Sequence, residues 1–329
     1  MTGIQLPATL IIARRDIVRV MNPADYLRAM ELAFRAAATG KAHSPQPMHM
    51  PVARGGFHAK GASISLDRDY VAVKINGNFP GNPVELGLPT IQGAILLSDG
   101  NNGVPLAVLD SIEVTLRRTA ATSALAARLL ARPQSRTLLV CGCGEQGRAH
   151  VESLREVLPI ERLLLWDGDY QAAAKLSAEL GAVAVKDLGT ATREADVITC
   201  CTTSRDPYLD ADMVAPGTFI AAVGADNPDK SEITPRLMAA AKVVTDATGQ
   251  CADLGDLHHA IEAGAMTAAN VHAELGEVVV GAKTGRNSPA DLIIFDSTGT
   301  GLQDVAASAV IYERCAGNQS VHSVALAGL

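Results

Sequence analysis

The segment Thr137-Leu-Leu-Val-Cys-Gly-Cys-Gly-Glu-Gln-Gly-Arg-Ala-His150 joins a short apolar run to a glycine pattern and then to the beginning of a helix. Its glycines, Gly142, Gly144 and Gly147, have the spacing G-x-G-x-x-G. In a strand-turn-helix unit the first glycine permits the tight turn, the second lets the backbone approach a pyrophosphate, and the third allows close helix-to-strand packing. The helix would offer unpaired N–H groups to the anion. The segment therefore predicts a dinucleotide-binding βαβ unit; the alternative is an ordinary strand-to-helix turn.

A carboxylate after the next predicted strand, residues 162–166, is the expected partner of a ribose. Asp167 follows the glycines by about 20 to 25 residues, where a carboxylate accepts hydrogen bonds from the adenosine ribose. Because it would repel a 2′-phosphate, the sequence favours NAD over NADP. Asp169 is the rival position, and a loop or helix-capping carboxylate is the alternative interpretation of Asp167.

Outward from this unit, short apolar strands alternate with helices. We expect strands at 137–141, 162–166, 182–185, 197–201, 218–223, 242–246 and 292–295, and helices at 145–158, 170–180 and 235–241. Strands of this kind indicate a parallel sheet covered on both faces. Residues 131–301 are therefore predicted to form a doubly wound Rossmann domain.

The first 130 residues predict a second, α+β domain. We expect a strand at 9–12, a helix from Asn22 or Pro23 to about Thr39, and a helix at 111–130. Extended segments at 48–52, 57–65, 70–75 and 93–98 are separated by turn-forming residues at 76–78 and 99–103, which indicates hairpins. A final helix, 302–315, lies in a C-terminal segment, 302–329, that is expected to join this domain.

Composition excludes several classes of function. The net charge of −7, with no Lys/Arg run longer than a pair, argues against a nucleic-acid partner. No apolar stretch reaches the ~20 residues of a membrane-spanning helix, and the N-terminus lacks a signal-peptide layout, so we expect a cytoplasmic protein. The six cysteines include no C-x-x-C pair and are expected to be free thiols. A metal site among the histidines, which include His258-His259, would need a further ligand at suitable spacing, so no metal is expected.

Three charged residues stand out against apolar surroundings. Strand alternation places Lys74 on one face of its strand with Tyr70 and Ala72. Arg118 precedes a stretch of small residues, and Asp226 follows an apolar strand at its carboxyl end, where open α/β sheets bind ligands. The alternatives are a solvated lysine, a surface salt bridge and a turn aspartate, respectively.

Four segments together resemble the ornithine cyclodeaminase and mu-crystallin family, which also contains alanine dehydrogenases and cyclic ketimine reductases. They are Lys74-Ile-Asn-Gly-Asn-Phe-Pro-Gly-Asn82, Arg118-Thr-Ala-Ala-Thr-Ser123, Gly142-Cys-Gly-Glu-Gln-Gly147 and Ala222-Val-Gly-Ala-Asp-Asn-Pro-Asp-Lys-Ser-Glu232. The resemblance extends from the helix near Asn22 to Asp304. It implies an NAD-dependent enzyme, a homodimer formed through the N-terminal substrate domain, and an active site in the cleft between the domains.

The resemblance also implies roles for single residues. Lys74 and Arg118 would hold the substrate carboxylate, and Asp226 would face the substrate nitrogen as acid or base. A guanidinium can bind a carboxylate through two hydrogen bonds, while a lysine adds a point charge. The cofactor candidates are Thr119, Gly142, Gly144, Glu145, Gln146, Gly147 and Asp167.

Two further substrate-binding candidates, His49 and Lys60, stand where the family has other residues. Many members have an arginine in a P-x-R segment, whereas this chain has Pro47-Met48-His49. Lys60 lies near the position of a glutamate in the cyclodeaminases. A cation there would be a poor neighbour for the distal amine of ornithine and a better one for an anionic or uncharged side chain.

These residues favour an NADH-dependent reductase or amino-acid dehydrogenase that moves a hydride between nicotinamide C4 and the Cα of an imino acid. The alternative is a cyclodeaminase, a lyase that uses NAD catalytically and releases ammonia from a diamino acid. A third hypothesis is a non-catalytic, crystallin-like protein that keeps only the cofactor pocket; intact Lys74, Arg118 and Asp226 argue against it.

Overall fold

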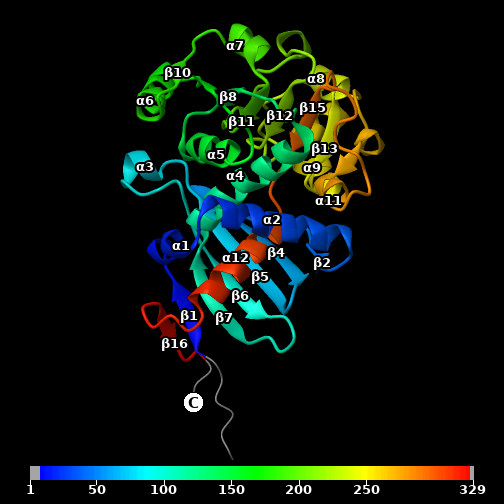
Figure 1. Ribbon diagram of the computed structural model, residues 1–329. Coiled ribbons are helices and arrows are strands. Elements are labelled where there is room, and N and C mark those ends of the chain that lie inside the picture. Colours follow the sequence, from blue (N-terminus) through cyan, green and yellow to red (C-terminus); the bar gives the residue numbers. More distant parts are fainter. Residues whose placement is uncertain (1–7, 327–329) are drawn as a thin grey trace, which may run out of the picture. The chain divides into compact units, whose positions relative to one another are not determined.

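The computed structural model describes residues 8–326. The chain divides into two compact units (Figure 1): unit 1 ends at Arg118 and resumes at Thr300, and unit 2 is Thr119–Gly299. The division falls inside helix α4 (Ser111–Leu130), whereas the sequence places the boundary at the end of this helix, near residue 130. One continuous helical pattern gives no local signal of such a division.

Unit 1 is built on a mixed sheet with the strand order β16-β1-β7-β6-β5-β4-β2, and β3 pairs with β4. The strands are β1 (Thr9–Ile12), β2 (Ala42–His43), β3 (Met48–Val52), β4 (Gly55–Ser65), β5 (Asp69–Asn78), β6 (Ile91–Asp99), β7 (Pro105–Asp110) and β16 (His322–Val324). Neighbours from β3 to β7 are antiparallel, as the predicted hairpins require. Strand β1 is parallel to β7, a pairing that no hairpin signal indicates.

Helices cover one face of this sheet. They are α1 (Arg14–Val20), α2 (Pro23–Ala38) and α12 (Gly301–Cys315), while the short α3 (Asn82–Glu85) is part of the connection between β5 and β6. The side chain of Asn22 caps α2 by accepting a hydrogen bond from the backbone N–H of Asp25, as predicted. Helix α12 packs against β4, β5 and α2 (Figure 1). A Cβ at Gly301 would lie 2.3 Å from the carbonyl oxygen of Gly61, so glycine lets α12 begin directly against β4.

The turn predicted at residues 76–78 is wrong, because β5 continues through Asn78. Asn78 pairs with Gly56 on β4 and with Ile91 on β6, so the segment has strand neighbours on both sides. A Cβ at Gly77 would come within 3.0 Å of the Phe57 ring, so glycine here serves close packing inside a strand. Turn-forming residues signal a turn only where no neighbouring strand competes for the backbone.

The uncovered face of the unit 1 sheet is apolar. On β5, Tyr70, Ala72 and Lys74 point toward the helices and are buried, whereas Val71, Val73 and Ile75 are exposed on the opposite face. The exposed apolar side chains that share this outer face by strand register are Met48, Met50, Val52, Phe57, Val71, Val73, Ile75 and Leu96. A contiguous exposed apolar face is uncommon on monomeric soluble proteins.

Unit 2 is a doubly wound domain with an eight-stranded sheet in the order β10-β9-β8-β11-β12-β15-β13-β14. The strands are β8 (Thr137–Cys141), β9 (Arg162–Trp166), β10 (Val183–Ala184), β11 (Val197–Cys200), β12 (Phe219–Ala222), β13 (Lys242–Thr245), β14 (Ala273–Glu274) and β15 (Ile293–Asp296). All of them pair in parallel. The strand order reverses beside β8, between β9 and β11, which makes this the topological switch point of a Rossmann fold. The predicted fold class is confirmed.

The sheet of unit 2 is covered by α5 (Glu145–Arg155), α6 (Tyr170–Leu180), α7 (Leu188–Glu194), α8 (Pro235–Ala240), α9 (Thr248–Leu254), α10 (Asp256–Glu262) and α11 (Leu275–Val279), together with two short 3-10 helices. Helix α6 spans the predicted residues 170–180: the Asp169 side chain caps its start by accepting from the N–H of Gln171, and Gly181 at its end is left-handed with φ of 65°. The short helices α7, α9, α10 and α11 were not predicted.

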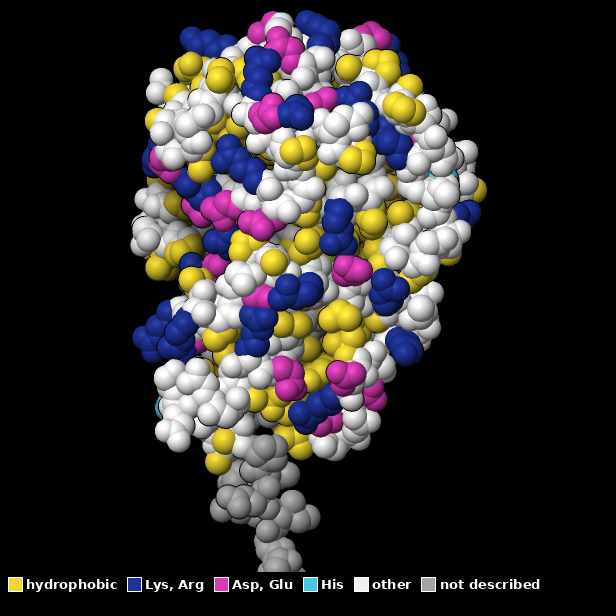
Figure 2. Space-filling view, viewed as in Figure 1, with side chains coloured by type: hydrophobic (Ala, Val, Ile, Leu, Met, Phe, Trp, Pro, Cys, Tyr) yellow, Lys and Arg dark blue, Asp and Glu magenta, His cyan; other side chains and the backbone are white. Residues whose placement is uncertain are grey.

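Within residues 8–326, no helix combines the length and apolar character needed to cross a bilayer. On the face of the molecule that Figure 2 shows, basic and acidic side chains are interspersed.

Candidate functional site

The glycine segment forms a tight turn between β8 and α5. Gly142 has φ of 105°, a conformation that favours glycine, and a Cβ there would lie 2.8 Å from the carbonyl oxygen of Cys201. A Cβ at Gly147 would lie 2.1 Å from the carbonyl oxygen of Gly142, so α5 starts against the turn. A Cβ at Gly144 would meet no heavy atom within 4 Å in the described chain, its own helix and chain neighbours aside. The backbone is therefore open to a ligand at Gly144.

These residues fit a bound pyrophosphate. Gly144 is the N-cap of α5, and no side chain of the described residues caps this helix end. Its first N–H groups therefore point at the open space, with the positive end of the helix dipole. Gln146, half-buried in the first turn, has a buried Oε1 without a hydrogen-bond partner among residues 8–326, and Glu145 is exposed.

Asp167 lies directly after β9, with its side chain on the glycine turn. Its Oδ2 accepts a hydrogen bond from the backbone N–H of Cys143 at 2.7 Å, and its Oδ1 accepts from the N–H of Asp169 at 2.9 Å. The helix-capping carboxylate is Asp169, since its Oδ1 accepts from the N–H of Gln171 at 2.9 Å. The structure thus separates the two rivals: Asp167 faces the turn and Asp169 caps α6.

Asp226 lies at the same sheet edge as the glycine turn, because β12 and β8 are parallel and both end there. Its side chain is 51% exposed in the loop after β12, and Lys230 Nζ lies 2.8 Å from its Oδ1. The carboxylate is accessible and held by a cation of its own loop.

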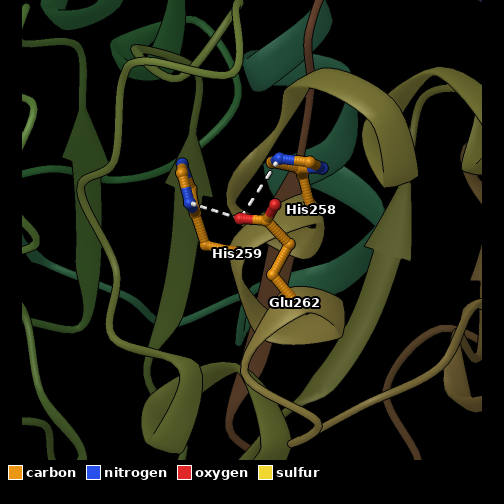
Figure 3. Close-up of side chains that lie close together, drawn as sticks. All are labelled: His258, His259 and Glu262. Carbon is orange, nitrogen blue, oxygen red and sulfur yellow. Dashed lines mark ion pairs between the residues drawn. The ribbon is translucent and has the colours of Figure 1, made fainter.

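Helix α10 holds this loop through the side chain of His259. Nε2 of His259 donates to the carbonyl oxygen of Lys230 at 2.8 Å, and Nδ1 of His258 donates to that of Ala252 in α9 at 3.1 Å. The remaining ring nitrogens face Glu262, with His258 Nε2 at 3.4 Å and His259 Nδ1 at 4.0 Å from Oε2 (Figure 3). These three side chains could present ligand atoms to a cation; their present contacts are ion pairs within one helix.

Glu232 is a buried residue that the sequence did not single out. Its Oε1 accepts from the backbone N–H of Thr202 at 2.7 Å and from the hydroxyl of Tyr208 at 2.9 Å, and its Oε2 accepts from the N–H of Gly224 at 2.8 Å. Burial, with Asp256 nearby, raises the pKa of Glu232 to about 7. Glu232 thereby joins the segment after β11 to the segment after β12, which carries Asp226.

In unit 1, Lys74 and Arg118 meet at one carboxylate. Asp304 Oδ2 lies 2.6 Å from Lys74 Nζ, and Asp304 Oδ1 accepts from Arg118 Nε at 3.1 Å. Arg118 Nη1 also donates to Gln303 Oε1 at 2.5 Å, and Lys74 Nζ donates to the hydroxyl of Thr115 at 3.2 Å. Lys74, Arg118 and Asp304 are each at most 5% exposed. Because both side chains are buried, Lys74 is not a solvated lysine and Arg118 does not form a surface salt bridge.

The charges of this cluster depend on one another. Burial lowers the pKa of Lys74 to about 7; Asp304 opposes this, while the cations Arg118 and Lys60 add to it. Burial would raise the pKa of Asp304, but Lys74 and Arg118 outweigh burial, so this pKa lies below its usual value. Asp304 is therefore the anion that holds two buried cations together.

Two candidates from the sequence, Lys60 and His49, lie on the same face of the sheet as Lys74. Lys60 on β4 is directly opposite Lys74 on β5, and His58 is opposite Asn76. His49 on β3 is opposite His58, and their rings stack with centroids 4.4 Å apart and an interplanar angle of 19°. Lys60 and His58 are partly buried and His49 is exposed. The structure thus brings His49, Lys60 and Lys74 to one face of the sheet.

Thr119 directly follows Arg118 in α4 and is the first residue of unit 2. Its side chain is half-buried, and its backbone carbonyl accepts from the Ser123 hydroxyl at 3.4 Å.

Comparison with known proteins agrees with this architecture. The alanine dehydrogenase of Archaeoglobus fulgidus is 35% identical over 93% of this chain and 94% of that protein. The structure of an archaeal alanine dehydrogenase dimer with bound NAD superposes with a TM-score of 0.92 at 34% identity, covering 97% of this chain and 100% of that chain. The structure of the iminosuccinate reductase of Paracoccus denitrificans in complex with NAD+ superposes with a TM-score of 0.89 at 30% identity. This match covers 97% of this chain and 99% of that chain. Residues 8–319 match the model of the ornithine cyclodeaminase/mu-crystallin family. The chain belongs to this family, as its sequence motifs predicted.

Proposed function

We propose that this protein is an NAD-dependent oxidoreductase that transfers a hydride between nicotinamide and the Cα of a small imino or amino acid. The observation that carries the proposal is the buried cluster of Lys74, Arg118 and Asp304. Two cations held at 5% exposure or less by one carboxylate form a ready site for a second carboxylate, that of the substrate.

In this proposal the cluster positions the substrate. The Arg118 guanidinium and the Lys74 ammonium bind the Cα carboxylate, while Asp304 keeps both cations in place. A bound carboxylate also favours the protonated form of Lys74, whose pKa burial lowers. When bound, NAD supplies or accepts the hydride at C4 of its nicotinamide. Orientation of Cα is the main contribution of these residues to the rate.

Asp226 is proposed as the acid or base at the substrate nitrogen. It is the accessible carboxylate at the sheet edge where α/β domains bind their ligands, and Lys230 and Glu232 restrain its loop. Reduction of an imine needs a proton on nitrogen, and oxidation of an amine needs its removal.

The cofactor would be held by unit 2. The N–H groups of α5 at Gly144 receive the pyrophosphate, Gly142 and Gly147 permit the close approach, and Asp167 accepts hydrogen bonds from the adenosine ribose. Glu145, Gln146 and Thr119 complete the proposed set. One carboxylate oxygen of Asp167 accepts from the N–H of Cys143 in the turn and the other from the N–H of Asp169, so its charge is fixed where a 2′-phosphate would be repelled.

A homodimer is part of the proposal, formed through the outer face of the unit 1 sheet. This face carries eight exposed apolar side chains in adjacent register positions, including Val73 and Ile75. A second copy of the same face would bury them, as an isologous interface does.

The competing cyclodeaminase function would place a distal ammonium in the substrate site. Lys60, directly opposite Lys74, makes this side of the cluster cationic and unfavourable for such a group.

One assay separates these functions: absorbance at 340 nm and ammonia are followed together. Purified protein receives NADH with cyclic imino acids, or NADH with 2-oxo acids and ammonium; a parallel mixture contains NAD with L-ornithine or L-lysine. We expect NADH consumption with an imino acid. Ammonia release from a diamino acid at constant absorbance would establish the lyase instead. If neither NADH consumption nor ammonia release were observed, the remaining hypothesis would be a non-catalytic binding protein.

A further inference from the structure

Helix α10 brings two imidazoles and a carboxylate together (Figure 3). Glu262 lies four residues after His258 and three after His259, and residues at these spacings are neighbours on a helix surface. One ligand atom of each side chain lies within 4.8 Å of the other two. The histidine side chains are 22% and 23% exposed and that of Glu262 is 64% exposed, so an ion can reach these atoms from solvent.

The backbone determines which nitrogen of each imidazole is available. Nδ1 of His258 lies 3.1 Å from the carbonyl oxygen of Ala252, and Nε2 of His259 lies 2.8 Å from that of Lys230. A carbonyl oxygen only accepts hydrogen bonds, so these two nitrogens carry protons. In a neutral imidazole the other nitrogen has a lone pair, and in both residues this nitrogen faces Glu262. Metal-ligating histidines share this arrangement, in which a hydrogen bond from the second nitrogen orients the ring.

The spacing of the three side chains suits a metal ion better than a hydrogen bond. Glu262 Oε2 is 3.4 Å from His258 Nε2 and 4.0 Å from His259 Nδ1. Both separations exceed the ~2.7–3.2 Å of an ordinary N–H···O hydrogen bond. Two ligand atoms bound at ~2.0–2.1 Å to one tetrahedral Zn²⁺ lie about 3.4 Å apart. The three ligand atoms therefore need only a small adjustment to surround such an ion.

We propose that His258, His259 and Glu262 form a binding site for a divalent transition metal of the zinc type, with water at the remaining position. Two imidazole nitrogens favour zinc over Mg²⁺ and Ca²⁺, which prefer oxygen ligands. The expectation from the sequence that no metal binds rested on a missing further ligand, and α10 brings Glu262 into that position. The site goes beyond the proposed hydride transfer and does not depend on it.

The metal would act on the loop that carries Asp226. His259 donates to the carbonyl oxygen of Lys230, and Lys230 Nζ lies 2.8 Å from Asp226 Oδ1. An ion that fixes the His259 ring also fixes its hydrogen bond to Lys230. The bound metal thus restrains the segment 226–232 from its far side, as a structural clamp that takes no part in bond making or breaking.

The first test is metal binding by the full chain, without a polyhistidine tag, freed of metal by EDTA and dialysis and with its thiols reduced. Titration calorimetry with ZnCl2 should show one Zn²⁺ per chain at this site. Zn²⁺ at about 100 times its Kd should raise the Tm by about 5 °C, while the same concentration of MgCl2 leaves it unchanged. Mg²⁺ binding as tight as that of Zn²⁺ would overturn a site made of two imidazoles.

Three variants each remove one ligand atom. His258→Asn and His259→Gln keep an amide N–H near the position of the nitrogen that donates to the backbone carbonyl, so the hydrogen bonds of α10 can persist. Glu262→Gln removes the charge and keeps the length of the side chain. We expect each variant to weaken Zn²⁺ binding ~100-fold or more, since loss of even an outer-shell partner costs ~10–100-fold.

His272→Gln is the matched control in the same unit. Nε2 of His272 also donates to a backbone carbonyl, that of Thr284 at 2.7 Å. This variant should bind Zn²⁺ with wild-type affinity. Wild-type affinity in both His258→Asn and Glu262→Gln would place the ion on other groups, such as the cysteine thiols, and would overturn the site.

Hydrogen exchange of the backbone amides tests the clamp. Zn²⁺ should slow exchange within residues 226–232 of the wild-type protein and should not do so in His259→Gln, which has lost a ligand. If exchange in this segment stayed the same with Zn²⁺ bound to the wild-type protein, the clamp would be overturned while the metal site remained. These measurements need no turnover, so failure of the proposed oxidoreductase activity would leave their outcome unaffected.

Discussion

Asp304 on α12 places its Oδ2 2.6 Å from the Nζ of Lys74 on β5, with the lysine 5% and the aspartate 1% exposed. The same carboxylate accepts a hydrogen bond from Arg118 on α4. Three elements that are distant in the sequence are thus joined at one buried anion, and this relationship makes the first two predictions possible.

Asp304→Asn removes the anion and leaves two buried cations without their shared counter-charge. We expect the free energy of unfolding to fall by about 3–5 kcal/mol, the usual result of removing one partner from a buried ion pair. Because the cations lose their positions, KM for the amino or imino acid should rise more than kcat falls. Chemical denaturation and steady-state kinetics measure both effects. Asp304→Glu should bring KM part of the way back to the wild-type value. If Asp304→Asn kept the wild-type KM and stability, Asp304 would position neither cation.

The pKa of Lys74, lowered to about 7, predicts an alkaline limb in kcat/KM. Lys74 must carry its proton to attract a carboxylate, so kcat/KM should fall about tenfold per pH unit above the pKa of the free enzyme. Lys74→Arg keeps the charge at all accessible pH values and should move this limb upward. If the alkaline limb stayed at the same pH in Lys74→Arg, it would belong to another titrating group.

The same pKa predicts how stability changes with pH. The pKa of Lys74 is lower in the folded protein than in the unfolded chain, so between about pH 7 and 10 the unfolded chain binds more protons. The contribution of Lys74 to the free energy of unfolding therefore rises with pH across this window and is constant below it. Denaturation at several pH values measures it, and Lys74→Met should reduce the rise. An identical pH dependence in Lys74→Met would contradict the shifted pKa.

Asp226→Asn tests the proposed acid or base. Turnover should fall ~100-fold or more with the affinity for NADH kept, since the amide cannot exchange the proton. Asp229→Asn is the control in the same loop, where Asp229 is exposed, and should retain turnover. Near-normal turnover of Asp226→Asn would exclude the role.

Asp167→Ser tests cofactor selection. Loss of the carboxylate beside the glycine turn should narrow the preference for NAD over NADP, measured as the ratio of kcat/KM values. Asp169→Ser is the control: it changes the cap of α6 and should alter stability by at most about 1 kcal/mol while leaving the ratio unchanged. If the ratio responds only to the Asp169 variant, the two roles are reversed.

Val73→Lys tests the association surface. A charge in the middle of the apolar sheet face should convert a dimer into a monomer, as measured by light scattering coupled to size-exclusion chromatography. Val18→Lys, at another exposed valine of unit 1, should remain dimeric. A dimer that persists in the Val73 variant would place the interface elsewhere.

The sequence by itself determined the parts of this protein that depend on neighbours along the chain. The G-x-G-x-x-G segment, the alternation of strands and helices in unit 2 and the caps Asn22 and Asp169 are local patterns, because turns, caps and periodicity are set by residues a few positions apart. Alternation along β5 also placed Lys74 on the same face as Tyr70.

Only the tertiary structure decided what those side chains meet. Asp304 reaches Lys74 because α12 packs on β5, and Lys60 lies opposite Lys74 because of one particular register between β4 and β5. A shift of that register by one residue would send Lys60 to the other face of the sheet, and no local pattern encodes the choice. The same reason explains the turn wrongly predicted at 76–78 and the role of Glu232. Both depend on strands or loops that become neighbours only when the chain has folded.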